Sequence, residues 1–241
     1  SLGLVGSEMC IRDRPARGEC MLFSRRERVE RGCWLRPDGE LVMSVDGVNT
    51  PIMNQSEIKI PGGHNVENYM AAICAAWGRV SPEDIRAVAQ TFAGVEHRAE
   101  LVRELDGVRW YNDSIATTPS RTVKGMLSLF DQKILLIAGG YDKKVPFDPM
   151  GEPVCEHVKV LVLMGATAPK IEAAVKAARS YKPGAPKILH VDSLQEAVDV
   201  CRREAKPGDI VAMSPACASF DMFPNFETRG DQFREMVQRL Q

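Results

Sequence analysis

From Gly94 to the C-terminus, short apolar segments alternate with segments of helical pattern, and this alternation constrains the fold more than any other feature of the chain. Strands are predicted at 99–105, 108–111, 133–138, 158–164, 187–191 and 209–213. Helices are predicted at 119–130, 168–180, 193–204 and 229–240. Such alternation is typical of a mostly parallel sheet that helices cover on both faces. The sequence therefore predicts an α/β domain of Rossmann-like organisation.

Residues 20–90 have another pattern, which predicts short strands and two helices. The segments 32–35 and 40–43 flank an Arg-Pro-Asp-Gly turn and predict a hairpin. Residues 57–60 alternate between polar and apolar as a half-buried strand does. Helices are expected at 66–77 and, after a Ser-Pro start, at 81–90.

A hairpin and two helices bury little apolar surface, so we expect this first part to be the tail of a larger domain. The apolar face formed by Val66, Met70 and Ile73 would then lack its partner sheet. We expect a boundary near residue 94, with a hinge at 95–98. Residues 1–14 fit nothing that follows and resemble a translated cloning adaptor, so they are left out of the fold prediction.

Charge and cysteine content narrow the function classes. The formal net charge of −1 gives no electrostatic reason to expect a nucleic acid or an anionic membrane as partner. No apolar run is long enough to span a bilayer. The seven cysteines are scattered, without a C-x-x-C pair, which predicts reduced thiols and a cytoplasmic protein. The four histidines form no zinc-ligand pattern.

Two polar loops directly follow predicted strands. The first is Asn112-Asp113-Ser114-Ile115-Ala116-Thr117-Thr118-Pro119, and the second is Ser214-Pro215-Ala216-Cys217-Ala218-Ser219-Phe220-Asp221. In open α/β sheets, ligands bind at the carboxyl ends of the strands. Taken alone, the first loop fits a capped βα turn without a ligand as well as it fits an anion site at a helix start.

Both loops, together with Glu96-His97-Arg98, resemble the Mur ligases of bacterial cell-wall synthesis, and most closely the D-glutamate-adding ligases among them. The resemblance extends from about Ile60 to the C-terminus. Sister ligases and folylpolyglutamate synthases carry different residues after the strand that ends at Asn112. The resemblance implies a Rossmann-like C-terminal domain at 95–241, preceded at 15–94 by the tail of a P-loop-type ATP-binding central domain.

The implied activity is ATP-dependent joining of D-glutamate to UDP-N-acetylmuramoyl-L-alanine, by way of an acyl phosphate, with ATP and Mg²⁺ as cofactors. The chain contains no Gly-Lys dipeptide and hence no Walker A loop. We therefore expect a fragment that is inactive alone, a monomer acting on small molecules, with the Mg²⁺ ligands mostly in the missing portion of the central domain.

The resemblance also implies site residues. ATP would be contacted by His64, Asn65, Asn68, Arg98 and Asp113. D-Glutamate would be contacted by Thr117, Lys143, Ser219 and Phe226. No catalytic residue and no metal ligand is assigned with certainty. Lys144 competes with Lys143, because a misalignment of one residue exchanges them. Some family members carry Lys where this chain has Ile115, so contacts of that Lys are not carried over.

Two alternatives stay open at this point. One is a non-catalytic Rossmann-like module that binds nucleotides or amino acids. The other is another relative among the Mur ligases and folylpolyglutamate synthases. Gly139-Gly140 does not complete a G-x-G-x-x-G pattern, so a dinucleotide oxidoreductase has little support.

Overall fold

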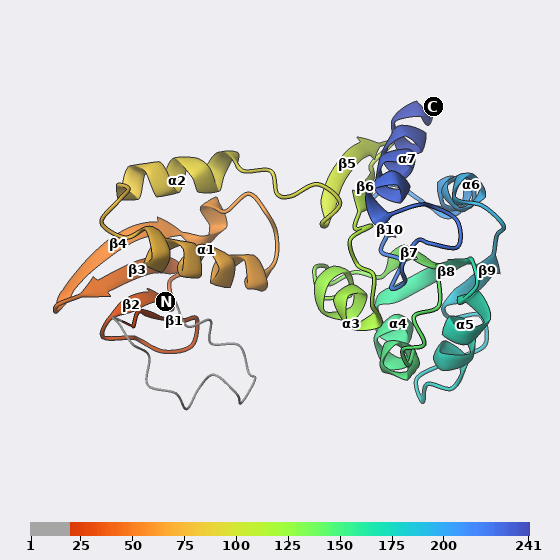
Figure 1. Cartoon of the computed structure of the whole chain (residues 1–241), viewed down its shortest axis with the longest axis horizontal. Helices are drawn as coiled ribbons and strands as arrows, with labels where there is room; N and C mark the ends of the chain where they lie inside the picture. The colour runs from red at the N-terminus through yellow and green to blue at the C-terminus, as the bar shows by residue number, and fades with distance from the viewer. Residues whose placement is uncertain (1–19) are drawn as a thin grey trace. The chain divides into compact units, whose positions relative to one another are not determined.

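The computed structural model describes residues 20–241, and the chain divides into two compact units between Ala93 and Gly94 (Figure 1). The adaptor-like segment 1–14 lies outside the described residues. None of the helices in the described part of the chain is long and apolar enough to cross a membrane.

The first unit is a four-stranded sheet with two helices. Its strands, in the order β1-β2-β3-β4, are β1 (Leu22–Ser24), β2 (Gly32–Leu35), β3 (Glu40–Val45) and β4 (Val48–Asn54). Its helices are α1 (Gly63–Ala76), α2 (Pro82–Thr91) and the 3-10 turn η1 (Gln55–Glu57). The predicted hairpin is confirmed as the antiparallel pair β2–β3. The strand predicted at 57–60 is wrong, because the side chains of Asn54 and Glu57 cap each other's backbone and turn the chain into η1.

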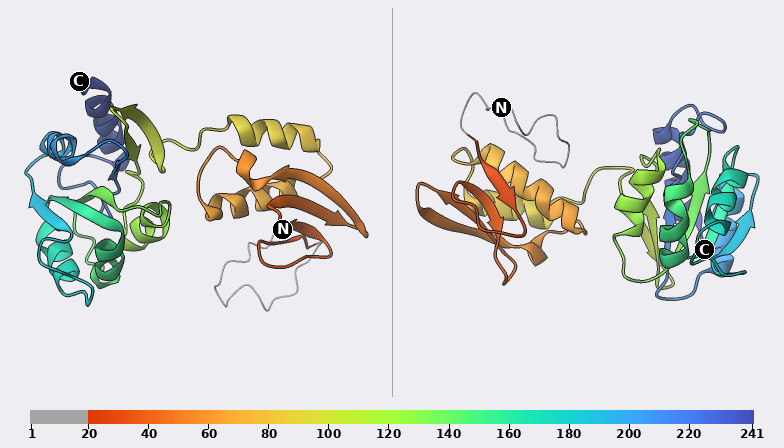
Figure 2. Two further views of the ribbon diagram at one scale, coloured as in Figure 1. Left: turned by 180° about the vertical axis from the view of Figure 1, so that it is seen from behind. Right: turned by 90° about the horizontal axis from the view of Figure 1, so that it is seen from below.

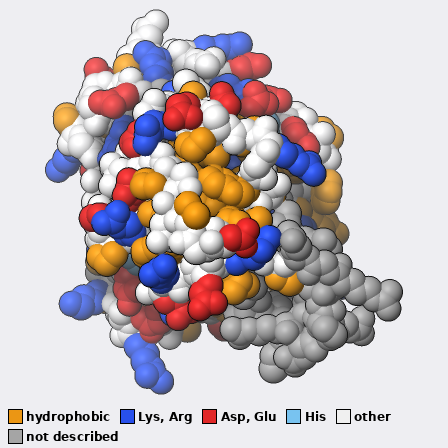
Figure 3. All heavy atoms as spheres, turned by 90° about the vertical axis from the view of Figure 1, so that its left-hand side faces the viewer, with side chains coloured by type: hydrophobic (Ala, Val, Ile, Leu, Met, Phe, Trp, Pro, Cys, Tyr) orange, Lys and Arg blue, Asp and Glu red, His pale blue; other side chains and the backbone are white. Residues whose placement is uncertain are grey.

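The prediction that the α1 face lacks a partner sheet is also wrong. Val66, Met70 and Ile73 are buried, and they belong to one core cluster with Leu41 and Met43 of β3. The reason is that β1 and β4, which were not predicted, extend the hairpin into a four-stranded sheet, in which β1, β2 and β3 contact α1 and β4 contacts α2. The unit still exposes some large apolar side chains, among them Val48 and Val88, and Figure 3 shows apolar side chains grouped on one of its faces.

The second unit contains a six-stranded sheet in the order β5-β6-β10-β7-β8-β9. The strands are β5 (Glu100–Leu105), β6 (Val108–Asn112), β7 (Ile134–Gly139), β8 (Val158–Met164), β9 (Lys187–His190) and β10 (Ile210–Met213). All neighbours are parallel except β5, which pairs antiparallel with β6. The predicted mostly parallel α/β fold is confirmed.

Helices cover both faces of this sheet, as the two further views show (Figure 2). They are α3 (Pro119–Arg121), continued by the π-helical segment η2 (Thr122–Leu127), the 3-10 turn η3 (Asp148–Met150), α4 (Gly151–His157), α5 (Ala168–Lys176), α6 (Leu194–Glu204) and α7 (Phe226–Arg239). One core contains residues of η2, α4 and α5, and the other contains residues of α6 and α7. Every residue of β7 is buried, as expected for a strand covered on both sides.

Candidate active site at the carboxyl edge of the sheet

The two polar loops singled out in the sequence meet at one edge of the second unit. Strand β10 lies between β6 and β7, and Met213 is in register with Asn112 on one side and Ile137 on the other. The loops that follow these three parallel strands therefore start side by side. This is the position at which open α/β sheets bind ligands.

Asp113 connects the first loop to the second. Its carboxylate accepts a hydrogen bond of 2.6 Å from the hydroxyl of Ser214 and one of 3.1 Å from the backbone N–H of Ala99. Burial raises the pKa of Asp113 to about 6, although both hydrogen bonds and the charges of Arg98 and Arg121 act in the opposite direction. The site thus holds a carboxylate that is ionised at neutral pH and rigidly oriented.

Arg229, from the first turns of α7, connects the same two loops from below the surface. Only 1% of the residue is exposed. Its guanidinium donates to the Ser114 hydroxyl (3.0 Å), the Ser114 carbonyl (2.9 Å) and the Cys217 carbonyl (3.1 Å). The remaining Nη1 is buried without a hydrogen-bond partner. Burial lowers the pKa of Arg229 to about 10, so the group stays cationic at neutral pH and places a buried positive charge at this edge.

The third loop, which follows β7, is held against the second. The backbone N–H of Tyr141 donates to the Ala218 carbonyl (2.9 Å), and that of Gly139 donates to the Pro215 carbonyl (2.8 Å). Gly140 has a φ of +143°, and a Cβ there would lie 2.5 Å from the Ala218 oxygen. The close approach of the two loops therefore requires glycine at this position.

The turn at residues 97–100 is fixed by a polar network at the start of β5. The backbone of His97 and Ala99, on either side of Arg98, has positive φ angles of 61° and 45°. The Asn112 amide Nδ2 lies 3.0 Å from Nδ1 of His97 and donates to Glu100 at 3.1 Å. Burial opposes ionisation of Glu100, but hydrogen bonds from Arg234 and from the His97 N–H lower its pKa overall. The network holds a strained backbone around an exposed arginine.

The family model described as "Mur ligase, glutamate ligase domain" matches residues 97–217, half of the chain. The chain belongs to the Mur ligase family. The matched region contains the Arg98 turn, Asp113 with its loop and the β7 loop, and it ends within the β10 loop. The predicted family is therefore confirmed.

Curated relatives with high identity to the chain carry the name of one ligase of this family. It is 50% identical over 228 residues to a UDP-N-acetylmuramoylalanine–D-glutamate ligase of Acetivibrio thermocellus, covering 94% of this chain and 48% of that protein. It is 48% identical over 226 residues to the ligase of the same name from Clostridium acetobutylicum, covering 93% and 48%. The chain spans about half the length of the curated relatives it matches.

Solved structures agree on the fold. A pseudomurein peptide ligase type C from Methanothermus fervidus matches with a TM-score of 0.59 at 14% identity, over 90% of this chain and 43% of that one. E. coli FolC, solved in complex with ADP, matches with a TM-score of 0.59 at 17% identity, over 86% and 47%.

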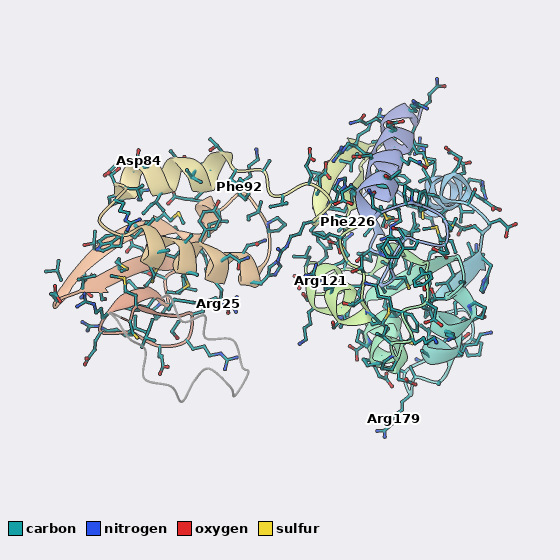
Figure 4. The ribbon with its side chains drawn as sticks, in the orientation of Figure 1. Arg25, Asp84, Phe92, Arg121, Arg179 and Phe226 are labelled. Atoms are coloured by element: carbon teal, nitrogen blue, oxygen red, sulfur yellow. The ribbon has the colours of Figure 1, made fainter. Side chains whose placement is uncertain are left out.

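The residues predicted to contact D-glutamate lie in the three loops and at the start of α7. Thr117 is half-buried after β6. Lys143 and Lys144 are exposed after β7 and form no ion pair with any described residue. Ser219 is buried after β10, and its carbonyl accepts from the Phe223 N–H at 2.8 Å. Phe226 begins α7, half-buried, with its ring edge-on to His97 at 6.1 Å between centroids (Figure 4). The roles of these residues stay predictions.

The residues predicted to contact ATP lie partly in the first unit and partly in the second. Arg98 and Asp113 belong to the second unit, as described. His64, Asn65 and Asn68 lie in the first two turns of α1 in the first unit. Asn68 donates to the Asn65 side chain at 3.2 Å, and Asn65 donates to the Pro61 carbonyl at 2.6 Å. Asn65 is thus engaged in shaping the helix start, while Asn68 is exposed.

Sequence reasoning missed Ser214 as the partner of Asp113, and Arg229 as the link between the loops. Among residues 20–241, no group of three or more His, Cys, Asp or Glu side chains is arranged to hold a metal ion.

Proposed function

We propose that these residues carry the glutamate-binding part of an ATP-dependent ligase that joins D-glutamate to UDP-N-acetylmuramoyl-L-alanine. In that reaction the substrate carboxylate attacks the γ-phosphate of ATP, and the amine of D-glutamate then displaces phosphate from the acyl phosphate. The observation that carries the proposal is the convergence of three loops at one sheet edge, two of which bind the buried, cationic Arg229. The 50% identity to a ligase of that name supports it.

Each polar group at the edge has a role in this proposal. Asp113 accepts from the hydroxyls of the ATP ribose, and Arg98 contacts the phosphates. Lys143 pairs with one carboxylate of D-glutamate, and Ser219 with the backbone N–H groups of its loop holds the other, because charge-assisted hydrogen bonds are the strongest contacts available to a carboxylate. Thr117 completes the polar lining, and Phe226 forms the apolar wall.

The 241 residues contain no Gly-Lys dipeptide, and so no Walker A loop. We propose that they make no amide bond by themselves and that the phosphate loop and the ligands of Mg²⁺ belong to another part of the ligase. None of the described residues is assigned to Mg²⁺ in this proposal. The buried cysteines Cys33, Cys74, Cys155, Cys201 and Cys217 are reduced, which favours action in the reducing cytoplasm. We further propose that the ligase acts as a monomer.

Thermal unfolding in the presence of candidate ligands tests the proposal. A ligand at a hundred times its Kd stabilises the folded chain by about 2.7 kcal/mol. We expect D-glutamate to raise the Tm and NAD to leave it unchanged. A shift with NAD and none with D-glutamate would instead identify a freestanding nucleotide-binding module.

A further inference from the structure

Arg121 is an exposed arginine whose side chain turns back over the β6 loop. It ends α3, two residues after Pro119. Its Nη1 donates to the carbonyl of Ile115 at 3.4 Å, near the upper limit of a hydrogen bond. The guanidinium therefore lies over the loop that carries Asp113 and Thr117, and within residues 20–241 most of its five N–H donors have no hydrogen-bond partner.

A second guanidinium, that of Arg98, acts on a carboxylate of the same loop. Arg98 and Arg121 both act electrostatically on the carboxylate of Asp113. Neither bonds to that carboxylate, whose two oxygens accept from Ala99 and Ser214. Within residues 20–241, neither arginine forms an ion pair. Two unpaired cations beside one buried carboxylate leave the surface of this loop with an excess of positive charge.

The loop itself provides no other cation. Residue 115 is a half-buried isoleucine, and the side chains from Asn112 to Ser120 are otherwise uncharged except for Asp113. A guanidinium presents its donors in a planar fork that matches a carboxylate or a phosphate. Among the side chains at residues 112–121, that of Arg121 is therefore the one best suited to contact an anionic oxygen.

We propose that Arg121 is an anion-binding residue of the site, which contacts a carboxylate or phosphate oxygen of the reactants. The inference rests on the proposed function and adds to it a residue that the family resemblance did not supply. Figure 4 shows Arg121 on the second unit, which also carries Phe226.

Isothermal titration of the 241-residue chain with D-glutamate, and separately with tripolyphosphate, tests the proposal. Arg121→Gln should weaken the binding of at least one of these anions by about tenfold or more, as expected for a lost charge-assisted hydrogen bond. Loss confined to D-glutamate identifies the carboxylate as the ligand, and loss confined to tripolyphosphate identifies the phosphate. Lys124→Gln, which removes an exposed cation one turn later, should change either affinity by less than about twofold.

A rescue variant separates charge recognition from a change in the loop. Ile115→Lys in the Arg121→Gln background returns a cation to the residue whose carbonyl Arg121 contacts, and it should recover a large part of the lost affinity. Unchanged affinity for both anions in Arg121→Gln, with normal binding by the wild type, would overturn the inference alone. Failure of the wild type to bind either anion would overturn the proposed function, and the inference with it.

Discussion

The hydroxyl of Ser214 donates a 2.6 Å hydrogen bond to the carboxylate of Asp113, although 101 residues separate the two in sequence. The contact exists because β10 inserts between β6 and β7, so that the ends of β6 and β10 coincide. It joins a titratable group to the loop that also carries Ser219.

The buried carboxylate should make stability depend on pH in a defined direction. Burial raises the pKa of Asp113 from 3.8 to about 6, so the folded chain holds this proton more tightly than the unfolded chain does. Protonation of the Asp113 carboxyl therefore adds to the free energy of unfolding below about pH 4. This stabilisation is lost as the pH rises through about 6. The difference between the two pKa values corresponds to about 3 kcal/mol.

Asp113→Asn removes the titration while keeping the shape of the side chain. Relative to the wild type, the free energy of unfolding of the variant should rise by about 2–3 kcal/mol between pH 4 and pH 7.5. Urea unfolding at several pH values measures the difference. Parallel pH profiles for the two proteins would show that Asp113 ionises normally.

Arg229→Met should destabilise the second unit. The change removes three hydrogen bonds from one buried side chain and leaves the carbonyls of Ser114 and Cys217 buried without that partner. We expect a loss of about 2–4 kcal/mol in urea unfolding. Arg239→Met is the matched control, because the Arg239 side chain at the end of the same helix is 80% exposed. If both substitutions lowered the free energy of unfolding by a similarly small amount, Arg229 would not be holding the loops together.

Lys143→Ala should weaken D-glutamate binding by about tenfold, since a carboxylate loses its charge-assisted partner. Lys144→Ala should have an effect of less than about twofold, because Lys143 is the residue assigned to the substrate carboxylate. The backbone of Lys144 is left-handed (φ 58°), and its N–H bonds to Asp142. Titration calorimetry compares the two variants. A large effect of Lys144 with none of Lys143 would show that the assignment in this loop is displaced by one residue.

The second unit could be predicted well because local pattern and tertiary environment agree there. The strand expected at 158–164 is β8 with the same bounds, since it is apolar except for Lys159 and all its other residues are buried. In the first unit, β4 was missed because it contains Pro51 and pairs only with β3, across an irregular register. The helix α4 was missed because it begins with glycine and has proline in its first turn.

The site also contains residues that could be predicted from the sequence and residues that could not. Asp113, Lys143 and Ser219 stand in loops directly after apolar strands, so their positions at the edge followed from the strand pattern. The pairing of Asp113 with Ser214 depends on strand order, which no local pattern encodes. Arg229 did carry a signal: it falls four residues before Phe233 and eight before Val237, on the buried face of α7, where an unpaired charge is rare.

The central claim is that D-glutamate binds where the three loops meet, and backbone amide NMR of the 241-residue chain tests it most directly. Addition of D-glutamate should shift the amide signals of residues 114–118, 140–144 and 216–220, while those of the first unit stay in place, and L-glutamate should cause much smaller shifts. Shifts confined to other residues, or equal shifts with both enantiomers, would contradict the account.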